Sequence, residues 1–219
     1  MNDYIQVLEE TILKYNGKHV LDSVKKEGAG FLKTYSEKKE AAYMFLDIRG
    51  FTNISKKLVA DTLLDDLNIY FEAMSDTILK NHGYIDSFIG DALFAFFGVS
   101  HDKYADDACR TALECMERLK IVNQKIQNRD IFEVGIGIAT GTSMIGNIGS
   151  GSKLKFTAMG DAVNLASRLE GLTSKYNAPI LICGNTQKKL TGTYSLRTVD
   201  TVTVKGLIGQ IDIYELRSP

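Results

Sequence analysis

The order of apolar stretches along the chain restricts its fold more than any other feature. Residues 84–88 and 92–97 are two apolar stretches around a Gly90-Asp91 turn, a pattern typical of a β-hairpin. Long helical patterns precede and follow this hairpin, over 55–82 and 104–128. The simple strand–helix–strand alternation of parallel sheets is absent. The sequence therefore predicts an α+β fold, with a mainly antiparallel sheet and helices on one of its faces.

The same patterns predict the remaining elements. We expect strands over 41–47, 132–140, 142–148, 179–183, 196–205 and 211–216, a loop over 149–152 and a helical turn over 187–190. Asp161 is expected to cap a helix over 161–176. An amphipathic N-terminal helix is followed by a break over 25–30 and a short second helix over 31–35. We thus expect a helical extension over 1–40 and one domain over 41–219.

Composition excludes several classes of function. The 219 residues are 44% hydrophobic and 24% charged, which is ordinary for a soluble globular protein. The net charge of −1 does not indicate a nucleic-acid partner or a membrane surface. Cys109, Cys115 and Cys183 are widely spaced, so we expect buried thiols rather than a zinc site or disulfides. The longest apolar run, 92–99, is too short to cross a bilayer and no signal peptide is visible, so a cytoplasmic location is expected.

Two aspartates stand where strands end. Asp47 closes the strand over 41–47, and a carboxylate that emerges from an apolar strand is costly unless it is used. Gly50 permits a tight turn, and Thr52 can cap the following helix, whose first N–H groups suit a phosphate. Asp91 lies in the hairpin turn. If the hairpin neighbours the strand over 41–47, the two carboxylates meet and offer the hard oxygen ligands that Mg²⁺ prefers. If the two residues do not meet, Asp47 only precedes a capped helix and Asp91 is an ordinary turn residue.

A third group of polar residues lies towards the C-terminus. Asn164 and Arg168 are four residues apart and share one helix face, where they offer an amide and a guanidinium to a phosphoryl group. Lys205 ends a strand before Gly206 and can supply a point charge. Alternatively, the Asn164–Arg168 pair and Lys205 are ordinary solvent-exposed side chains without a role in binding. The sequence contains no GxxxxGK[ST] motif and no dinucleotide-binding glycine pattern.

Five stretches, taken together, resemble the class III adenylate/guanylate cyclase catalytic domain. They are FLDIRGFT (45–52), GYIDSFIGDALFAFFG (83–98), GIGIATGTSMIGNIG (135–149), FTAMGDAVNLASRLE (156–170) and VKG (204–206), and they occur in the family's order. The resemblance extends over about 41–216. It implies a ferredoxin-like core and a head-to-tail homodimer with its sites at the interface.

The resemblance also assigns roles to residues. It implies that Asp47, Asp91 and the Ile48 carbonyl hold two Mg²⁺ or Mn²⁺ ions, one acidifying the ribose 3′-hydroxyl and the other neutralising phosphates. Arg49, Gly50, Phe51 and Thr52 are the substrate-binding turn. Asn164 would orient the ribose, Arg168 would stabilise charge at the α-phosphate, and Lys205 would hold the terminal phosphates, all three from the partner subunit. The implied reaction converts a nucleoside triphosphate to a 3′,5′-cyclic nucleotide and pyrophosphate.

The identity of the base is open because of one position. Adenylate cyclases usually carry a lysine where this chain has Ser87, and guanylate cyclases tend to carry a glutamate. The second base-reading position, Thr157, fits bacterial adenylate cyclases, so ATP is the favoured substrate. The alternatives are a CTP or UTP cyclase of a bacterial anti-phage system and a non-catalytic nucleotide-binding regulatory module. A third alternative is a two-metal phosphodiesterase or polymerase-like enzyme, but the near-neutral net charge of the chain does not support binding of a nucleic acid.

Overall fold

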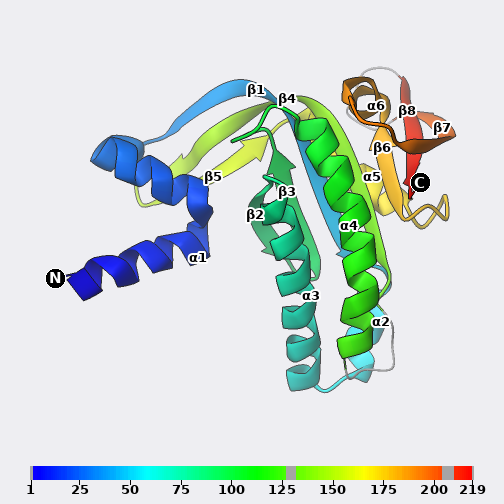
Figure 1. The fold of residues 1–219 in the computed structure, drawn as a ribbon, viewed down its shortest axis with the longest axis horizontal. Helices are drawn as coiled ribbons and strands as arrows, with labels where there is room; N and C mark the ends of the chain where they lie inside the picture. Colours follow the sequence, from blue (N-terminus) through cyan, green and yellow to red (C-terminus); the bar gives the residue numbers. More distant parts are fainter. Residues whose placement is uncertain (1, 127–131, 204–209, 219) are drawn as a thin grey trace.

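A twisted sheet of eight strands forms the centre of the computed structural model, which describes residues 2–126, 132–203 and 210–218 (Figure 1). The strand order is β2-β3-β1-β4-β6-β8-β7, and β5 pairs with β4. The strands are β1 (Tyr35–Ile48), β2 (Tyr84–Ile89), β3 (Ala92–Phe97), β4 (Val134–Ser150), β5 (Lys153–Met159), β6 (Ile180–Cys183), β7 (Ser195–Thr203) and β8 (Gln210–Arg217). The pairings are antiparallel except that of β4 with β6. The expected α+β fold is confirmed.

The helices are α1 (Asn2–Glu27), a 3-10 turn η1 (Gly28–Phe31), α2 (Phe51–Lys57), α3 (Ala60–Lys80), α4 (Tyr104–Lys125), α5 (Asp161–Leu172) and α6 (Gly184–Lys189). The helix expected over 55–82 is two helices, because Leu58 and Val59 adopt extended backbone between α2 and α3. The side chain of Leu58 then packs against the core.

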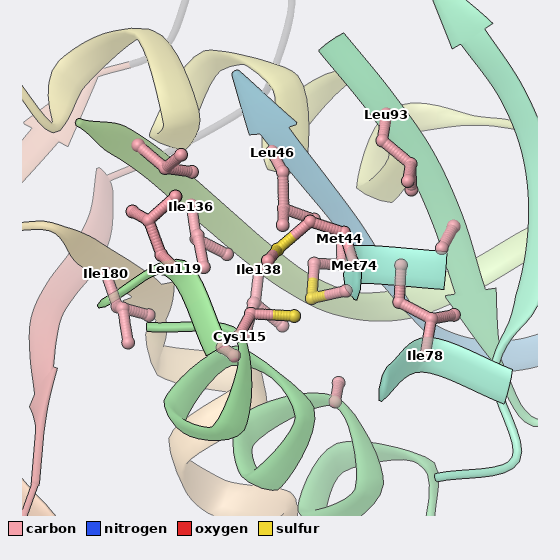
Figure 2. Close-up of a cluster of buried hydrophobic side chains, with 14 of the residues drawn as sticks. Met44, Leu46, Met74, Ile78, Leu93, Cys115, Leu119, Ile136, Ile138 and Ile180 are labelled. Atoms are coloured by element: carbon pink, nitrogen blue, oxygen red, sulfur yellow. The ribbon is translucent and has the colours of Figure 1, made fainter. Parts of the chain in front are cut away.

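Helices cover both faces of the sheet, and the expectation of one covered face is wrong. Helices α3 and α4 lie side by side across the face that carries Met44 and Leu46 (Figures 1 and 2). The opposite face of the same strand carries Tyr43 and packs against residues of α5, including Leu165. Tyr43 and Met44 are neighbours in sequence and both are fully buried. A strand that is apolar at consecutive positions must bury both of its faces, which requires a second layer of cover.

Strand β4 is longer than its sequence indicates. It runs unbroken through Gly141, where two separate strands were expected, because it pairs with β1 along the whole length of that strand. A Cβ atom at Gly141 would come within 2.9 Å of the Ala162 side chain. The glycine is therefore required by the close approach of α5 rather than by a turn.

The N-terminal segment is helical, then joins the sheet. Helix α1 is kinked at Gly17, whose φ of 82° favours glycine. The short helix expected over 31–35 is absent: Phe31 ends the 3-10 turn with its ring buried, and β1 begins at Tyr35. Helix α1 extends away from the sheet (Figure 1) and exposes apolar side chains, including Tyr4 and Tyr15. Within the described ranges, no helix combines the length and apolar character needed to cross a membrane.

Candidate active site

The two aspartates meet at one end of the sheet. Strand β3 pairs with β1 in a register that places Leu46 opposite Leu93, so Asp47 and the β2–β3 turn lie at the same edge. Gly90, with φ 65°, makes this turn. The two carboxyl groups lie close enough for Asp91 to raise the pKa of Asp47. The sequence prediction that the two carboxyl groups come together is confirmed.

The Asp47 carboxyl is held in an environment that disfavours its charge. Burial, the hydrogen bond with Asp91 and the negative charges of Asp91 and Glu170 raise its pKa from 3.8 to about 7, while the backbone N–H of Ile48 opposes the shift. Its Oδ1 atom is buried and has no hydrogen-bond partner. A buried oxygen without a partner is costly. The site therefore favours any cation that supplies the missing contact.

Glu170 is a third carboxylate near the pair, and sequence reasoning missed it. It lies on α5, where burial raises its pKa to about 7. The positive charge of Arg49 opposes this rise, and the negative charge of Asp91 adds to it. A Cβ atom at Gly135 would lie 2.8 Å from Glu170 Oε1, and Gly135 is the β4 residue opposite Asp47. The only available signal was its place two residues after Arg168 on the same helix.

The residues present fit a divalent cation. Among the described residues, no group of three or more His, Cys, Asp or Glu side chains is placed to hold a metal ion. Mg²⁺ and Mn²⁺ do not require such a group, because water and phosphate oxygens complete their coordination once one or two carboxylates are in place. Asp47 and Asp91 are such a pair, and the orphaned Asp47 Oδ1 is the observation that supports the fit.

Two hydrogen bonds of Arg49 hold the turn after Asp47. The Arg49 backbone N–H donates to the Glu133 carbonyl (2.7 Å), and the Arg49 side chain donates to the Ala178 carbonyl (3.3 Å). Gly50, with φ 67°, is the residue that precedes α2. The expectation that Thr52 caps the helix is wrong, because Phe51 already begins it and Thr52 lies within its first turn. The left-handed glycine starts the helix two residues earlier than a threonine cap would.

Asn164 and Arg168 lie one helical turn apart on α5, and both are exposed. Ala162, Leu165 and Leu169 of the same helix are buried. The helix thus packs one face on the sheet and presents the polar pair outwards, as the sequence predicts. Gly160, rather than the expected Asp161, is the N-terminal cap residue, and Asp161 opens the helix. Lys205, expected to hold phosphates, lies outside the described residues.

Ser87 and Thr157 are brought together by a residue that sequence reasoning missed. Asp86 accepts hydrogen bonds from the Ser87 hydroxyl (2.8 Å) and from the Thr157 hydroxyl. Lys155 forms an ion pair with the same carboxylate (2.5 Å). The cluster joins β2 to β5, two strands that are not hydrogen-bonded neighbours in the sheet. Its members differ in exposure, since the side chain of Asp86 is 2% exposed and that of Lys155 is 48% exposed.

Comparison with known families identifies this arrangement. The model of the adenylate and guanylate cyclase catalytic domain matches residues 34–218. The chain belongs to this family. Among curated relatives, adenylate cyclase 1 of Rhizobium meliloti is 36% identical over 82% of this chain, and the terminal-differentiation-specific adenylate cyclase of Dictyostelium discoideum is 39% identical over 81%. The chain spans only 28% and 9% of the lengths of these two relatives.

Solved structures of the cyclase family share the fold. The adenylyl cyclase CyaB of P. aeruginosa superposes with a TM-score of 0.78 at 33% identity, over 85% of this chain and 97% of that one. The guanylyl cyclase Cya2 gives 0.73 at 32%, over 84% and 94%. A bacterial light-regulated adenylyl cyclase gives 0.86 at 26%, over 98% of this chain and 62% of that one. The sequence identity of this chain to the adenylyl cyclase CyaB (33%) is thus almost the same as its identity to the guanylyl cyclase Cya2 (32%).

Proposed function

We propose that this chain is a nucleotidyl cyclase that converts a nucleoside triphosphate to a 3′,5′-cyclic nucleotide and pyrophosphate. In this reaction the ribose 3′-oxygen forms a bond to the α-phosphorus, and the bond from that phosphorus to the bridging oxygen of the leaving pyrophosphate breaks. The observation that carries the proposal is that the carboxyl groups of Asp47 and Asp91 come together at one edge of the sheet. Membership of the cyclase family supports it.

Asp47, Asp91 and the Ile48 carbonyl would hold two Mg²⁺ or Mn²⁺ ions. When bound, such ions neutralise phosphate charge and make a hydroxyl more acidic. The protein's own contribution is to hold the carboxylates at a fixed place and to keep Asp47 Oδ1 buried without another partner. Between Arg49 and Thr52, the turn fixed by the Glu133 and Ala178 carbonyls is the proposed phosphate-binding segment.

We propose that the polar pair on α5 acts across a head-to-tail homodimer. Asn164 would orient the ribose, and Arg168 would stabilise the charge that develops at the α-phosphate. Their exposure supports this assignment, because a side chain that completes the site of a second subunit must face outwards. Lys205 is proposed to contact the terminal phosphates.

ATP is the proposed substrate, since three curated relatives that match 80–82% of this chain are adenylate cyclases. Ser87 is the specific observation that favours two other candidates, a CTP or UTP cyclase and a nucleotide-binding module without turnover. These candidates differ in their products, so a single assay separates them.

The test is to incubate the purified protein with Mn²⁺ and each of ATP, GTP, CTP and UTP, and to identify the products by mass. We expect cyclic AMP and pyrophosphate, and no product from the Asp47→Ala variant. A cyclic product from CTP or UTP alone would replace the ATP assignment. Nucleotide binding with no pyrophosphate from any of the four would overturn the proposed activity.

A further inference from the structure

Strand β2 contains a bulge at Asp86, which interrupts the regular alternation of side chains between the two faces of the sheet. The pairing of β2 with β3 runs from Ile85 opposite Ala95 to Ser87 opposite Phe94, so Asp86 is the extra residue. A bulge turns neighbouring side chains towards the same side of a strand. Asp86 and Ser87 therefore both reach the cluster, and the Ser87 hydroxyl donates to Asp86 Oδ2.

The buried carboxylate fixes the polarity of both hydroxyls. A carboxylate only accepts hydrogen bonds, so the Ser87 and Thr157 hydroxyls must each point their hydrogen at Asp86. Each hydroxyl then has only lone pairs left for another molecule. Ser87 and Thr157 are thereby hydrogen-bond acceptors towards a ligand.

Lys155 is the donor of the cluster. Its ammonium group uses one direction on Asp86 Oδ2 and keeps further N–H groups, and its side chain is 48% exposed. Lys155 and Thr157 lie on one face of β5, whereas Leu154, Phe156 and Ala158 turn towards the other face, where Phe156 and Ala158 join the core. Figure 1 shows β5 near β2, and the hydrogen bond from Thr157 to Asp86 joins this face of β5 to the β2–β3 hairpin, whose turn contains Asp91.

We propose that Lys155, held by Asp86, is a specificity-determining residue that donates to the nucleotide base in place of residue 87. The inference rests on the proposed function and deepens it by defining the class of base. One donor and two acceptors fit a base edge that has an exocyclic amine and an acceptor beside it. For ATP, Lys155 would donate to adenine N1, and Ser87 or Thr157 would accept from the N6 amine.

The same polarity disfavours uracil. The uracil edge presents two carbonyl oxygens and one N–H, which is the reverse of what the cluster supplies. At least one carbonyl oxygen would face a hydroxyl lone pair, and a polar group left without a partner in a closed site is costly. UTP is accordingly expected to be the poorest of the four substrates.

The test compares Lys155→Met with Lys155→Arg, and uses Lys153→Met as the matched control. Lys153 lies two residues earlier on the same face of β5 and carries the same charge. For each protein, kcat/KM and the equilibrium dissociation constant are measured for ATP, GTP, CTP and UTP. We expect Lys155→Met to lower kcat/KM and affinity for ATP about 10- to 100-fold and for UTP far less, so that selectivity collapses. Lys155→Arg should keep most of the selectivity, and Lys153→Met all of it.

Binding and turnover separate the two proposals. Turnover whose base selectivity is unchanged in Lys155→Met would overturn the role of Lys155 and leave the cyclase intact. Selective binding that depends on Lys155, without any turnover, would support the role and overturn the activity. Equal effects of Lys153→Met and Lys155→Met, or a wild-type protein that prefers UTP, would also overturn the inference.

Discussion

At the scale of single residues, Asp47 is a residue whose surroundings strongly oppose its ionised form. The Asp47 carboxyl is partly buried beside two other carboxyl groups, and its pKa is raised from 3.8 to about 7. A raised carboxyl pKa means that the folded state binds the proton more tightly than the unfolded state does. The stability that this proton provides is complete below about pH 4 and is lost as the pH rises towards 7.

Asp47→Asn should therefore stabilise the metal-free protein while abolishing turnover. An amide cannot ionise, so the variant escapes the loss of stability between pH 4 and 7, and it can still hydrogen-bond to Asp91. We expect a gain on the order of 1–2 kcal/mol at pH 8, discounted for partial exposure, and almost none at pH 4. The difference in free energy of unfolding between the variant and the wild type is measured by urea denaturation in EDTA at several pH values. A gain that does not vary with pH would contradict the assigned cause.

At the scale of elements, the position of α5 is set by a glycine of β4. A Cβ atom at Gly137 would lie 2.2 Å from both the Ala166 carbonyl oxygen and the Glu170 nitrogen, so the helix rests directly on the strand backbone. Any side chain at this position must push the helix outwards, because both obstructing atoms belong to backbone. Asn164, Arg168 and Glu170 are carried by this helix and would move with it.

Gly137→Ala should lower the free energy of unfolding by about 3 kcal/mol and remove most activity. Gly171→Ala is the matched control, since Gly171 lies on α5 itself and an added Cβ meets nothing within 4 Å. The control should gain about 0.5–1 kcal/mol from better helix propensity and keep its activity. Chemical denaturation and the pyrophosphate assay provide the two measurements. Equal stabilities for the two variants would show that the close approach does not constrain the helix.

At the scale of the whole molecule, the candidate site is divided between two surfaces. Asp47 and Asp91 belong to the edge of the sheet, and the exposed residues Asn164 and Arg168 belong to the outward face of α5. A head-to-tail homodimer would join one surface of each subunit to the other surface of its partner. Each dimer would then carry two equivalent sites.

Mixing two inactive variants tests this division. Asp47→Ala and Arg168→Ala should each be nearly inactive, and an equal mixture should recover about a quarter of the wild-type activity through heterodimers with one intact site. The matched control is a mixture of Asp47→Ala with Asp91→Ala, in which every heterodimer site lacks one carboxylate. Activity that stays absent from the first mixture, once subunit exchange is shown by mass, would exclude sites shared between subunits.

Most of the elements, and the meeting of the two aspartates, could be predicted from local patterns in the sequence. The apolar strands around Gly90-Asp91 carry a local hairpin signal, and one strand pairing with β1 suffices to bring Asp91 to Asp47. The polar face of α5 was equally predictable, because helical periodicity alone separates Asn164 and Arg168 from the buried residues. These features depend on local patterns and on one neighbouring strand.

The second layer of helices and the cluster of Ser87, Lys155 and Thr157 around Asp86 became visible only in the folded chain. Asp86 meets Lys155 and Thr157 across 69 and 71 residues of chain, between strands that are not paired in the sheet. No periodicity encodes such a contact, because it depends on where the folded sheet places β5 relative to β2. Glu170 is near Asp47 for a similar reason, since glycines in β4 let α5 approach the sheet closely. Patterns in the sequence specify which side of an element is buried, whereas three-dimensional packing decides which distant side chains meet there.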